Sequence, residues 1–199
     1  MNESANYLEI YRDGGIYDDA MYGGIYISKG VRFARFMEKH ISKKSKVVCI
    51  GCGNGFEVVE YLNQGHDAYG VETHSIENVK PLEGRIIKAE VPNLPFKDKE
   101  FDLLHCTEVL EHIPPETTDA FLNECKRVSV KQFFSIATEM DSFRTHINLQ
   151  KPSWWIETFS RNKMSVMNFQ INPIFSNIYG DFLLDVYYTD GITVLCYQK

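Results

Sequence analysis

Three glycines at alternate positions, Gly51, Gly53 and Gly55, follow an apolar run in the stretch KVVCIGCGNGFEVVEYL. A glycine turn between a strand and a helix lets backbone N–H groups approach a ligand closely. The dinucleotide-binding pattern fails, because it requires a small residue where this chain has Phe56. The triphosphate-binding pattern fails too, because no Gly-Lys-Ser/Thr follows. The turn is predicted either to hold a ligand without gripping a phosphate, or to be a simple joint between strand and helix.

Two carboxylates end the next apolar runs. Glu72 closes DAYGVE, where its two oxygens could accept both hydroxyls of a ribose. Its alternative role is that of an exposed acid at a strand end, and the spacing from the glycines favours the ribose. Glu90 closes GRIIKAE and is placed to accept a hydrogen bond from an exocyclic amino group, while the N–H of Val91 could meet a ring nitrogen. These residues together predict an adenosine held without a phosphate.

Two further acids and two histidines form a second candidate site. If TEVLEHI is helical, Glu108, Glu111 and His112 lie at i, i+3 and i+4 and share one face, and His146 follows in a later loop. Carboxylates with two imidazoles would suit Mg²⁺, Mn²⁺ or Zn²⁺. Without a metal, His112 or His146 could be a general base, and Glu111 would brace the loop. His105 lies in an apolar run and is predicted to be a core residue.

Strands and helices alternate along the chain, which predicts an α/β fold with a mostly parallel sheet and helices on both faces. The predicted strands are residues 46–50, 67–72, 84–90, 101–106 and 131–137, and the predicted helices are residues 31–41, 56–64, 107–113, 116–128 and 153–164. Two β-rich runs flank Asp190-Gly191, a hairpin signal that adds an antiparallel strand. We predict one domain over residues 1–199, with an N-terminal cap and helix in 1–44 and a core in 45–199. The Tyr-rich residues 1–30 could form a lid.

Composition narrows the class of protein. The net charge of -6 argues against nucleic-acid binding, which usually shows a basic face. No apolar run reaches the roughly 18 residues that span a bilayer, and the start resembles no signal peptide. The five cysteines, an odd number, predict reduced thiols and a cytoplasmic protein. Cys49 and Cys52 form a CxxC, but a redox or metal role is disfavoured because Cys49 lies inside an apolar run.

These motifs resemble class I S-adenosylmethionine-dependent methyltransferases of the small type-11 kind over residues 45–160. The family's run of strand and glycines matches VVCIGCGNG, except that Cys49 replaces its acidic residue. The resemblance implies a Rossmann-like seven-stranded sheet with an antiparallel last strand, and S-adenosylmethionine as cofactor. The cofactor-binding residues it implies are Gly51, Cys52, Gly53, Gly55, Glu72, Glu90, Val91, Cys106 and Thr107. The last two belong to FDLLHCTEVLEHI, whose loop would pass the methionine part.

The E-x-x-E-H pattern with a later histidine is similar to two groups of metal-using O-methyltransferases. That resemblance implies Glu108, Glu111, His112 and His146 as ligands of a divalent cation. The stretch THINLQKPSWWIETF resembles methyltransferases of sugar modification, which favours O-methyl transfer to a small polar hydroxyl compound or sugar. Two alternatives stay open: a partner or regulatory protein that binds the cofactor without catalysis, and a nicotinamide-dependent oxidoreductase, which Phe56 disfavours. The oligomeric state is left undecided.

Overall fold

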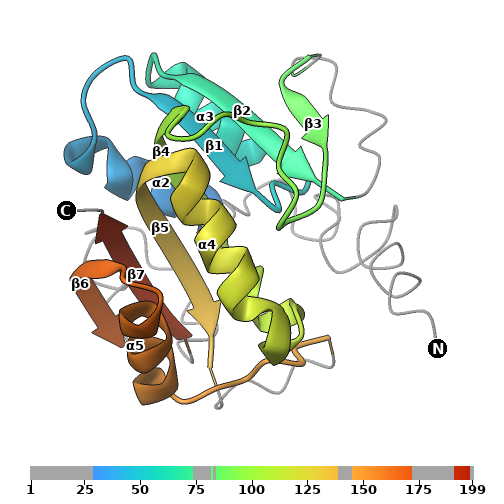
Figure 1. Cartoon of the computed structure of the whole chain (residues 1–199). Coiled ribbons are helices and arrows are strands. Elements are labelled where there is room, and N and C mark those ends of the chain that lie inside the picture. Colours follow the sequence, from blue (N-terminus) through green and yellow to red (C-terminus); the bar gives the residue numbers. More distant parts are fainter. Residues whose placement is uncertain (1–28, 74–81, 83, 139–144, 172–190, 198–199) are drawn as a thin grey trace, which may run out of the picture.

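The computed structural model describes residues 29–73, 82, 84–138, 145–171 and 191–197. Seven strands form one sheet in the order β3-β2-β1-β4-β5-β7-β6 (Figure 1). The strands are β1 Lys46–Ile50, β2 Asp67–Glu72, β3 Ile86–Lys88, β4 Phe101–Thr107, β5 Ser129–Ala137, β6 Ser165–Ile171 and β7 Gly191–Tyr197. The pairs among β1 to β5 are parallel, and β7 is antiparallel to both of its neighbours. The predicted seven-stranded Rossmann-like sheet is therefore confirmed.

Helices cover both faces of the sheet. They are α2 Lys29–Met37, α3 Phe56–Asn63, α4 Thr118–Val128 and α5 Pro152–Arg161, with the short 3-10 helices η1 Glu38–His40, η3 Leu110–His112 and η4 Pro115–Thr117. In Figure 1, α4 and α5 lie in front of the sheet and α2 and α3 lie behind it. The predicted lid in residues 1–30 lies outside the described residues, apart from the two that begin α2.

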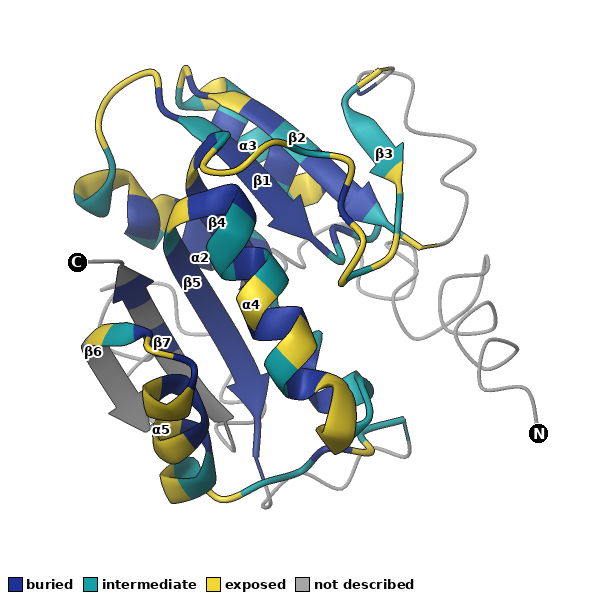
Figure 2. Ribbon diagram, viewed as in Figure 1, coloured by how far each residue is buried: buried dark blue, intermediate teal, exposed yellow. Residues whose placement is uncertain are grey.

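Side chains that alternate along the strands build a core on each face, because successive residues of a strand point in opposite directions. In β1, Val48 and Ile50 join the cluster under α4 and α5, whereas Val47 and Cys49 join the cluster under α2 and α3. Figure 2 shows the central strands buried between helices whose outer sides are exposed. The buried sheet positions the carboxyl ends of β1, β2 and β4 at one edge, where ligands of such folds bind.

The first arm of the predicted Asp190-Gly191 hairpin lies outside the described residues, and its second arm is β7. Among the described residues, β7 pairs with β5 along one edge and with β6 along the other. The sheet also contains β6, a strand that we did not predict from the sequence. A register shift between Val166 and Asn168 breaks the alternation in β6 on which strand prediction depends.

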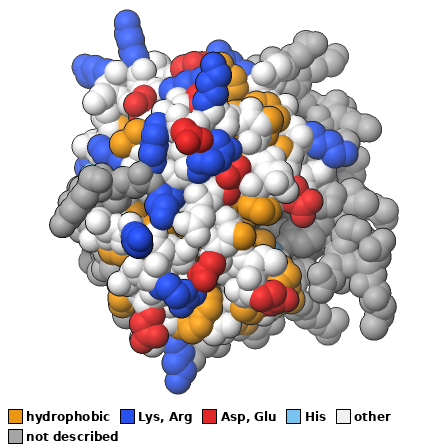
Figure 3. Space-filling model, in the orientation of Figure 1, with side chains coloured by type: hydrophobic (Ala, Val, Ile, Leu, Met, Phe, Trp, Pro, Cys, Tyr) orange, Lys and Arg blue, Asp and Glu red, His pale blue; other side chains and the backbone are white. Residues whose placement is uncertain are grey.

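Charged side chains of both signs are mixed on the face of the molecule that the space-filling view shows. In Figure 3, Lys and Arg side chains are scattered among acidic and uncharged ones over the face shown. Among the described residues, no helix combines the length and apolar character that crossing a bilayer requires.

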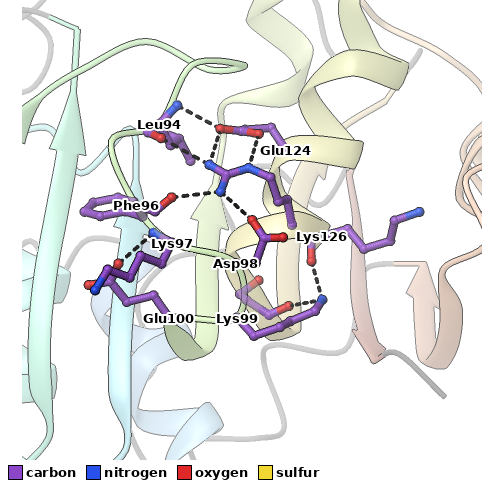
Figure 4. Close-up of polar contacts among 10 residues, drawn as sticks. Leu94, Phe96, Lys97, Asp98, Lys99, Glu100, Glu124 and Lys126 are labelled. Carbon is purple, nitrogen blue, oxygen red and sulfur yellow. Dashed lines mark hydrogen bonds and ion pairs between the residues drawn. The ribbon is translucent and has the colours of Figure 1, made fainter.

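A polar cluster fastens the segment between β3 and β4 to α4 (Figure 4). The Arg127 guanidinium donates hydrogen bonds to the backbone oxygens of Leu94 and Phe96 and to the carboxylates of Asp98 and Glu124. Glu124 in turn accepts from the N–H of Leu94 at 2.8 Å. The cluster therefore holds the segment that begins just after the predicted adenine-binding residues.

Replacing Arg127 by alanine is expected to lower the free energy of unfolding by about 1–2 kcal/mol. The loss arises because two backbone oxygens and the carboxylate of Glu124, which is 11% exposed, lose their charged donor. Urea denaturation of the two proteins measures the difference. The matched control is Arg161→Ala, which removes an ion pair with Asp119 whose side chains are both about half exposed. An equal loss in the control would contradict the fastening role.

Candidate active site

The glycine turn follows β1 and folds over the end of β2. Gly51, Gly53 and Gly55 have φ angles of 65°, 49° and 76°, in the left-handed region where residues with a side chain are strained. The N–H groups of Gly51 and Cys52 both donate to the oxygen of Val71, at 2.9 and 3.2 Å. The turn therefore lies at the carboxyl edge of the sheet.

Glu72, the last residue of β2, is bound to this turn. Its Oε2 accepts from the N–H of Gly53 at 3.0 Å, and its Oε1 accepts from the N–H of Thr73 at 2.8 Å. A carboxylate has about four lone-pair sites, so these bonds orient the group and are compatible with further hydroxyl donors. The half-buried acid is thus positioned between the turn and the strand end, where the sequence placed a ribose.

The segment after β3 lies beside Glu72. The N–H of Ala89 donates to the Glu72 backbone oxygen at 3.2 Å, and the N–H of Asn93 donates to the oxygen of Glu90 at 2.8 Å. Glu90 is exposed, and Val91 is partly buried against the core. These positions suit residues that contact adenine. The Glu90 carboxylate can accept from its amino group, and the N–H of Val91 can donate to a ring nitrogen.

Phe56 does not carry the steric cost that the dinucleotide-binding pattern assigns to its position. Its side chain is 41% exposed, so a bulky residue there does not obstruct the contact between helix and sheet. The close contact occurs at Gly55 instead, where an added methyl group would collide with Leu82.

The cysteines near the turn are buried thiols. All five cysteines are buried and free of disulfides. Burial raises the pKa of Cys49 and Cys52. The Glu57 carboxylate raises the pKa of both thiols further, and Glu72 adds to the shift of Cys52. A high thiol pKa suppresses the thiolate that redox chemistry and metal binding need. Cys106 is also buried, so only its backbone can face a ligand, whereas Thr107 is half-buried at the end of β4.

Glu57, in the first turn of α3, is a residue near the turn that we did not predict. Burial raises the pKa of its carboxyl to about 7, and the charge of Glu72 adds to the shift. Its proximity to the glycine turn was visible in the sequence, but nothing there showed that its side chain turns inward.

The segment after β4 differs from the predicted helix. Glu108 has a φ of 56°, and only Leu110–His112 form a 3-10 turn, η3. Glu108 therefore does not share a helical face with Glu111 and His112. Its carboxylate instead accepts from the Ser135 hydroxyl at 2.8 Å. The prediction of Glu108 as a metal ligand beside the other three is wrong in this arrangement, because the backbone turns its side chain towards β5.

The other three predicted residues are brought together. Ligand atoms of Glu111, His112 and His146 all lie within 4.8 Å of one another. The imidazole rings of His112 and His146 are 4.5 Å apart between centroids and nearly perpendicular, at 79°. Two imidazoles beside a carboxylate can exchange protons with a substrate or hold a cation.

Backbone hydrogen bonds fix this cluster. The oxygen of Glu111 accepts from the N–H groups of Ile147 and Asn148, both at 2.9 Å, which clamps the later loop onto η3. The buried Asn148 amide donates to the oxygen of Leu110 at 3.1 Å. Because these bonds flank His146 in sequence, they explain why a residue so far along the chain lies beside His112.

The tautomer of His112 follows from one contact. Its Nδ1 lies 3.1 Å from the backbone oxygen of Thr145, which can only accept a hydrogen bond. Nδ1 must then carry the proton, and in the neutral ring Nε2 carries the lone pair. Glu111 is fully buried, and its Oε1 accepts from the N–H of Ala137 at the end of β5. The cluster is therefore ordered for a base or a ligand at Nε2.

The glycine turn and the cluster of Glu111, His112 and His146 adjoin each other. A methyl group added at Gly51 would collide with Val109, which lies between the end of β4 and η3. The glycine turn and the segment that carries Glu111 and His112 thus meet at the carboxyl edge of the sheet.

Residues 48–132 match the family described as methyltransferase domain. The chain resembles methyltransferase domains over these residues. It is 32% identical over 119 residues to norajmaline N-methyltransferase of Rauvolfia serpentina, an alignment that covers 52% of this chain and 38% of that protein. This chain thus spans little more than a third of that relative's length.

Several solved structures share the fold of this chain at low sequence identity. One is 1,6-didemethyltoxoflavin-N1-methyltransferase of Burkholderia thailandensis with bound S-adenosylhomocysteine, with a TM-score of 0.70, 16% identity, and coverage of 98% of this chain and 86% of that one. Another is the [4+2]-cyclase SpnF, with a TM-score of 0.63, 10% identity, and coverage of 84% and 80%. Since the same fold carries a transferase and a cyclase, the activity has to be argued from the site.

Proposed function

We propose that this chain binds S-adenosylmethionine and transfers its methyl group to an oxygen of a small polar hydroxyl compound or sugar. The observation that carries the proposal is the Glu72 carboxylate fixed to the Gly53 N–H at 3.0 Å, on the glycine turn that adjoins the His112 and His146 pair. The turn and the pair thus supply a nucleoside-binding end and a proton-accepting end at one edge of the sheet.

The nucleoside end has the groups that adenosine needs. Glu72 can accept both ribose hydroxyls, and a charged acceptor makes each of these hydrogen bonds stronger than a neutral one would. Glu90 and the N–H of Val91 offer an acceptor and a donor to the adenine edge. This arrangement contains no cationic group for a phosphate among these residues, which fits a sulfonium cofactor better than a nicotinamide dinucleotide.

The proton-accepting end can prepare an acceptor hydroxyl. The bound cofactor supplies a methyl group on a positively charged sulfur, which an oxygen attacks in line as the C–S bond breaks. His112 Nε2 takes the hydroxyl proton, because Nδ1–H is held by Thr145. The Glu111 carboxylate, within 4.8 Å, stabilises the imidazolium that forms, and His146 orients the acceptor.

The proposal is tested by calorimetric titration with S-adenosylhomocysteine and with NADH, followed by a screen of hydroxyl compounds with methyl-labelled S-adenosylmethionine. Binding of the first ligand alone, with label transferred to an alcohol or sugar, is expected. Binding of NADH instead would favour the oxidoreductase alternative. Tight cofactor binding without transfer to any acceptor would favour a partner or regulatory protein.

N-methyl transfer is a second candidate. Two of the similar proteins, norajmaline N-methyltransferase and 1,6-didemethyltoxoflavin-N1-methyltransferase, are named for transfer to nitrogen. A nitrogen acceptor also loses a proton during the reaction, so the same histidine base would serve it. The screen therefore includes amines and nitrogen heterocycles, and label on nitrogen would replace the O-methyl assignment.

A divalent cation is the second candidate for the histidine cluster. Two imidazoles and one carboxylate form a common ligand set that leaves positions open for a substrate, and such a cation would polarise the acceptor oxygen. The His112 Nδ1–H bond to a backbone carbonyl is the kind of outer contact that orients metal-binding histidines. The residues present therefore fit Mg²⁺, Mn²⁺ or Zn²⁺ at Glu111, His112 and His146.

Titration of Mn²⁺ into chelator-stripped protein loaded with S-adenosylhomocysteine separates the two roles of the cluster. A cation site is expected to give saturable binding that disappears in His146→Ala and persists in Glu108→Ala, because Glu108 is turned towards Ser135. Absence of saturable binding would remove the cation and leave His112 as a base. Binding that needs Glu108 would contradict the three-residue cluster.

A further inference from the structure

Three polar side chains form a continuous hydrogen-bonded row through the core on the α3 side of the sheet. The Tyr61 hydroxyl of α3 lies 2.8 Å from His105 Nδ1, and His105 Nε2 lies 2.6 Å from Thr107 Oγ1. Tyr61 and His105 are 0% and 1% exposed, whereas Thr107 is half-buried at the end of β4. The row therefore leads from the interior to the edge where the cofactor is proposed to bind.

The position of His105 is as buried as positions that usually hold an apolar residue. Its ring packs against those of Tyr61 and Phe133, with centroids 5.6 and 5.3 Å apart. Burying an imidazole costs free energy unless both nitrogens are hydrogen-bonded, and here both are. Burial also lowers the pKa of His105 to about 3, so the ring is neutral at physiological pH. A neutral imidazole has one donor and one acceptor nitrogen.

The burial of Tyr61 determines which group donates and which accepts in each hydrogen bond of the row. Within the described part of the chain, the Tyr61 hydroxyl has no hydrogen-bond partner other than His105. If Nδ1–H donated to it, the phenolic proton would be buried without an acceptor, which is costly. Tyr61 therefore donates to Nδ1, and Nε2–H donates to Thr107. The Thr107 hydroxyl proton is then left to point away from His105, at the half-buried end of β4.

We propose that Tyr61 and His105 are positioning residues that fix the Thr107 hydroxyl as a hydrogen-bond donor to the carboxylate of the amino-acid part of bound S-adenosylmethionine. The inference rests on the proposed cofactor. A hydroxyl that accepts from Nε2–H and directs its own proton outward offers that proton to an anionic oxygen, so the row favours ligands that carry the carboxylate of the amino-acid part.

Calorimetric titration with two ligands tests this role. S-adenosylhomocysteine carries the carboxylate, and 5′-methylthioadenosine has the same nucleoside and sulfur without it. Tyr61→Phe and Thr107→Val are each expected to weaken binding of the first ligand by about 5- to 10-fold and to leave the second unchanged. The double variant is expected to match the single ones, because the two residues act through one row.

The control is Ser129→Ala, at the amino end of β5. Its buried hydroxyl donates to the oxygen of Cys125 at 2.7 Å and accepts from the Gln132 amide at 3.0 Å. This variant loses buried hydrogen bonds as Tyr61→Phe does, but Ser129 lies at the edge of the sheet opposite to the carboxyl ends of the parallel strands. It is expected to be less stable than the parent and to keep the affinity for both ligands.

The outcomes separate this inference from the proposed cofactor. If the parent protein binds neither ligand, both the cofactor and the row's role are overturned. If it binds both and Tyr61→Phe binds them equally well, or weakens both equally, the cofactor stands and the positioning role is overturned. Nitrogen-15 spectra of the His105 imidazole test the direction without any substitution: a proton on Nδ1 in place of Nε2 would overturn it.

Discussion

Methyl transfer is expected to slow by about 10²- to 10⁴-fold when His112 is replaced by glutamine, while affinity for S-adenosylhomocysteine stays within a factor of two of the parent. The expected effect is on the chemical step, because His112 is the base proposed for the acceptor proton, whereas Glu72, Glu90 and Val91 are the residues proposed to bind the nucleoside. The measurement is kcat and KM with an acceptor identified by the label-transfer screen.

The matched control is His40→Gln. His40 ends η1, ahead of the amino end of β1, and its backbone oxygen accepts from Lys131 Nζ at 2.9 Å. This variant keeps the backbone bond and loses an imidazole far from the carboxyl edge. It is expected to retain the parent kcat. A His112→Gln protein with an unchanged kcat would remove the general-base assignment.

Replacing Glu72 by alanine is expected to weaken binding of S-adenosylhomocysteine by roughly 1–3 kcal/mol, because the two ribose hydroxyls lose a charged acceptor. The Gly53 N–H loses its acceptor as well, so part of the effect comes from the glycine turn. Glu72→Gln separates the contributions: its amide oxygen can still accept from Gly53 while the charge is lost. Calorimetry on the three proteins measures both contributions.

An exposed acid elsewhere controls for the change in net charge. Glu116, in η4, is exposed, and Glu116→Ala is expected to bind the ligand as the parent does. Unchanged affinity in Glu72→Ala would remove the ribose assignment. Equal losses in Glu72→Ala and Glu116→Ala would show a general electrostatic effect instead of a contact.

The sequence predicted best what depends on local pattern. The strands at residues 46–50 and 67–72 have the bounds that their apolar runs predicted, because a buried parallel strand is apolar on both faces. The turn formed by the three glycines was predicted for a similar reason: their left-handed backbone restricts the residue type at each position.

Pairing between distant segments was harder to predict. The Asp190-Gly191 signal describes a turn and says nothing of which strands already occupy the edges of β7. Likewise, the spacing of Glu108, Glu111 and His112 implies a shared face only if the backbone is helical, and the positive φ of Glu108 removes that condition. Sequence patterns carry no direct signal for such non-local constraints.

The row of Tyr61, His105 and Thr107 illustrates what the sequence contained but did not reveal. His105 was predicted to be a core residue, and it is buried. The alternation of His105 and Thr107 along β4 put both on one face, which was a usable signal. The contribution of Tyr61 from α3 depends on how the helix packs on the sheet, and only the structure shows it.

The position of β7 between β5 and β6 has a consequence for synthesis on the ribosome. β6 ends at Ile171 and β7 begins at Gly191, yet among the described strands of the sheet β6 pairs only with β7. A nascent chain that has just completed β6 therefore cannot add that strand to the sheet, and the outer edge of β5 stays open until β7 has emerged. Open strand edges invite pairing with other chains. Losing β7 by premature termination would thus disconnect β6 from the sheet and expose an interior strand, a far more damaging event than trimming an edge.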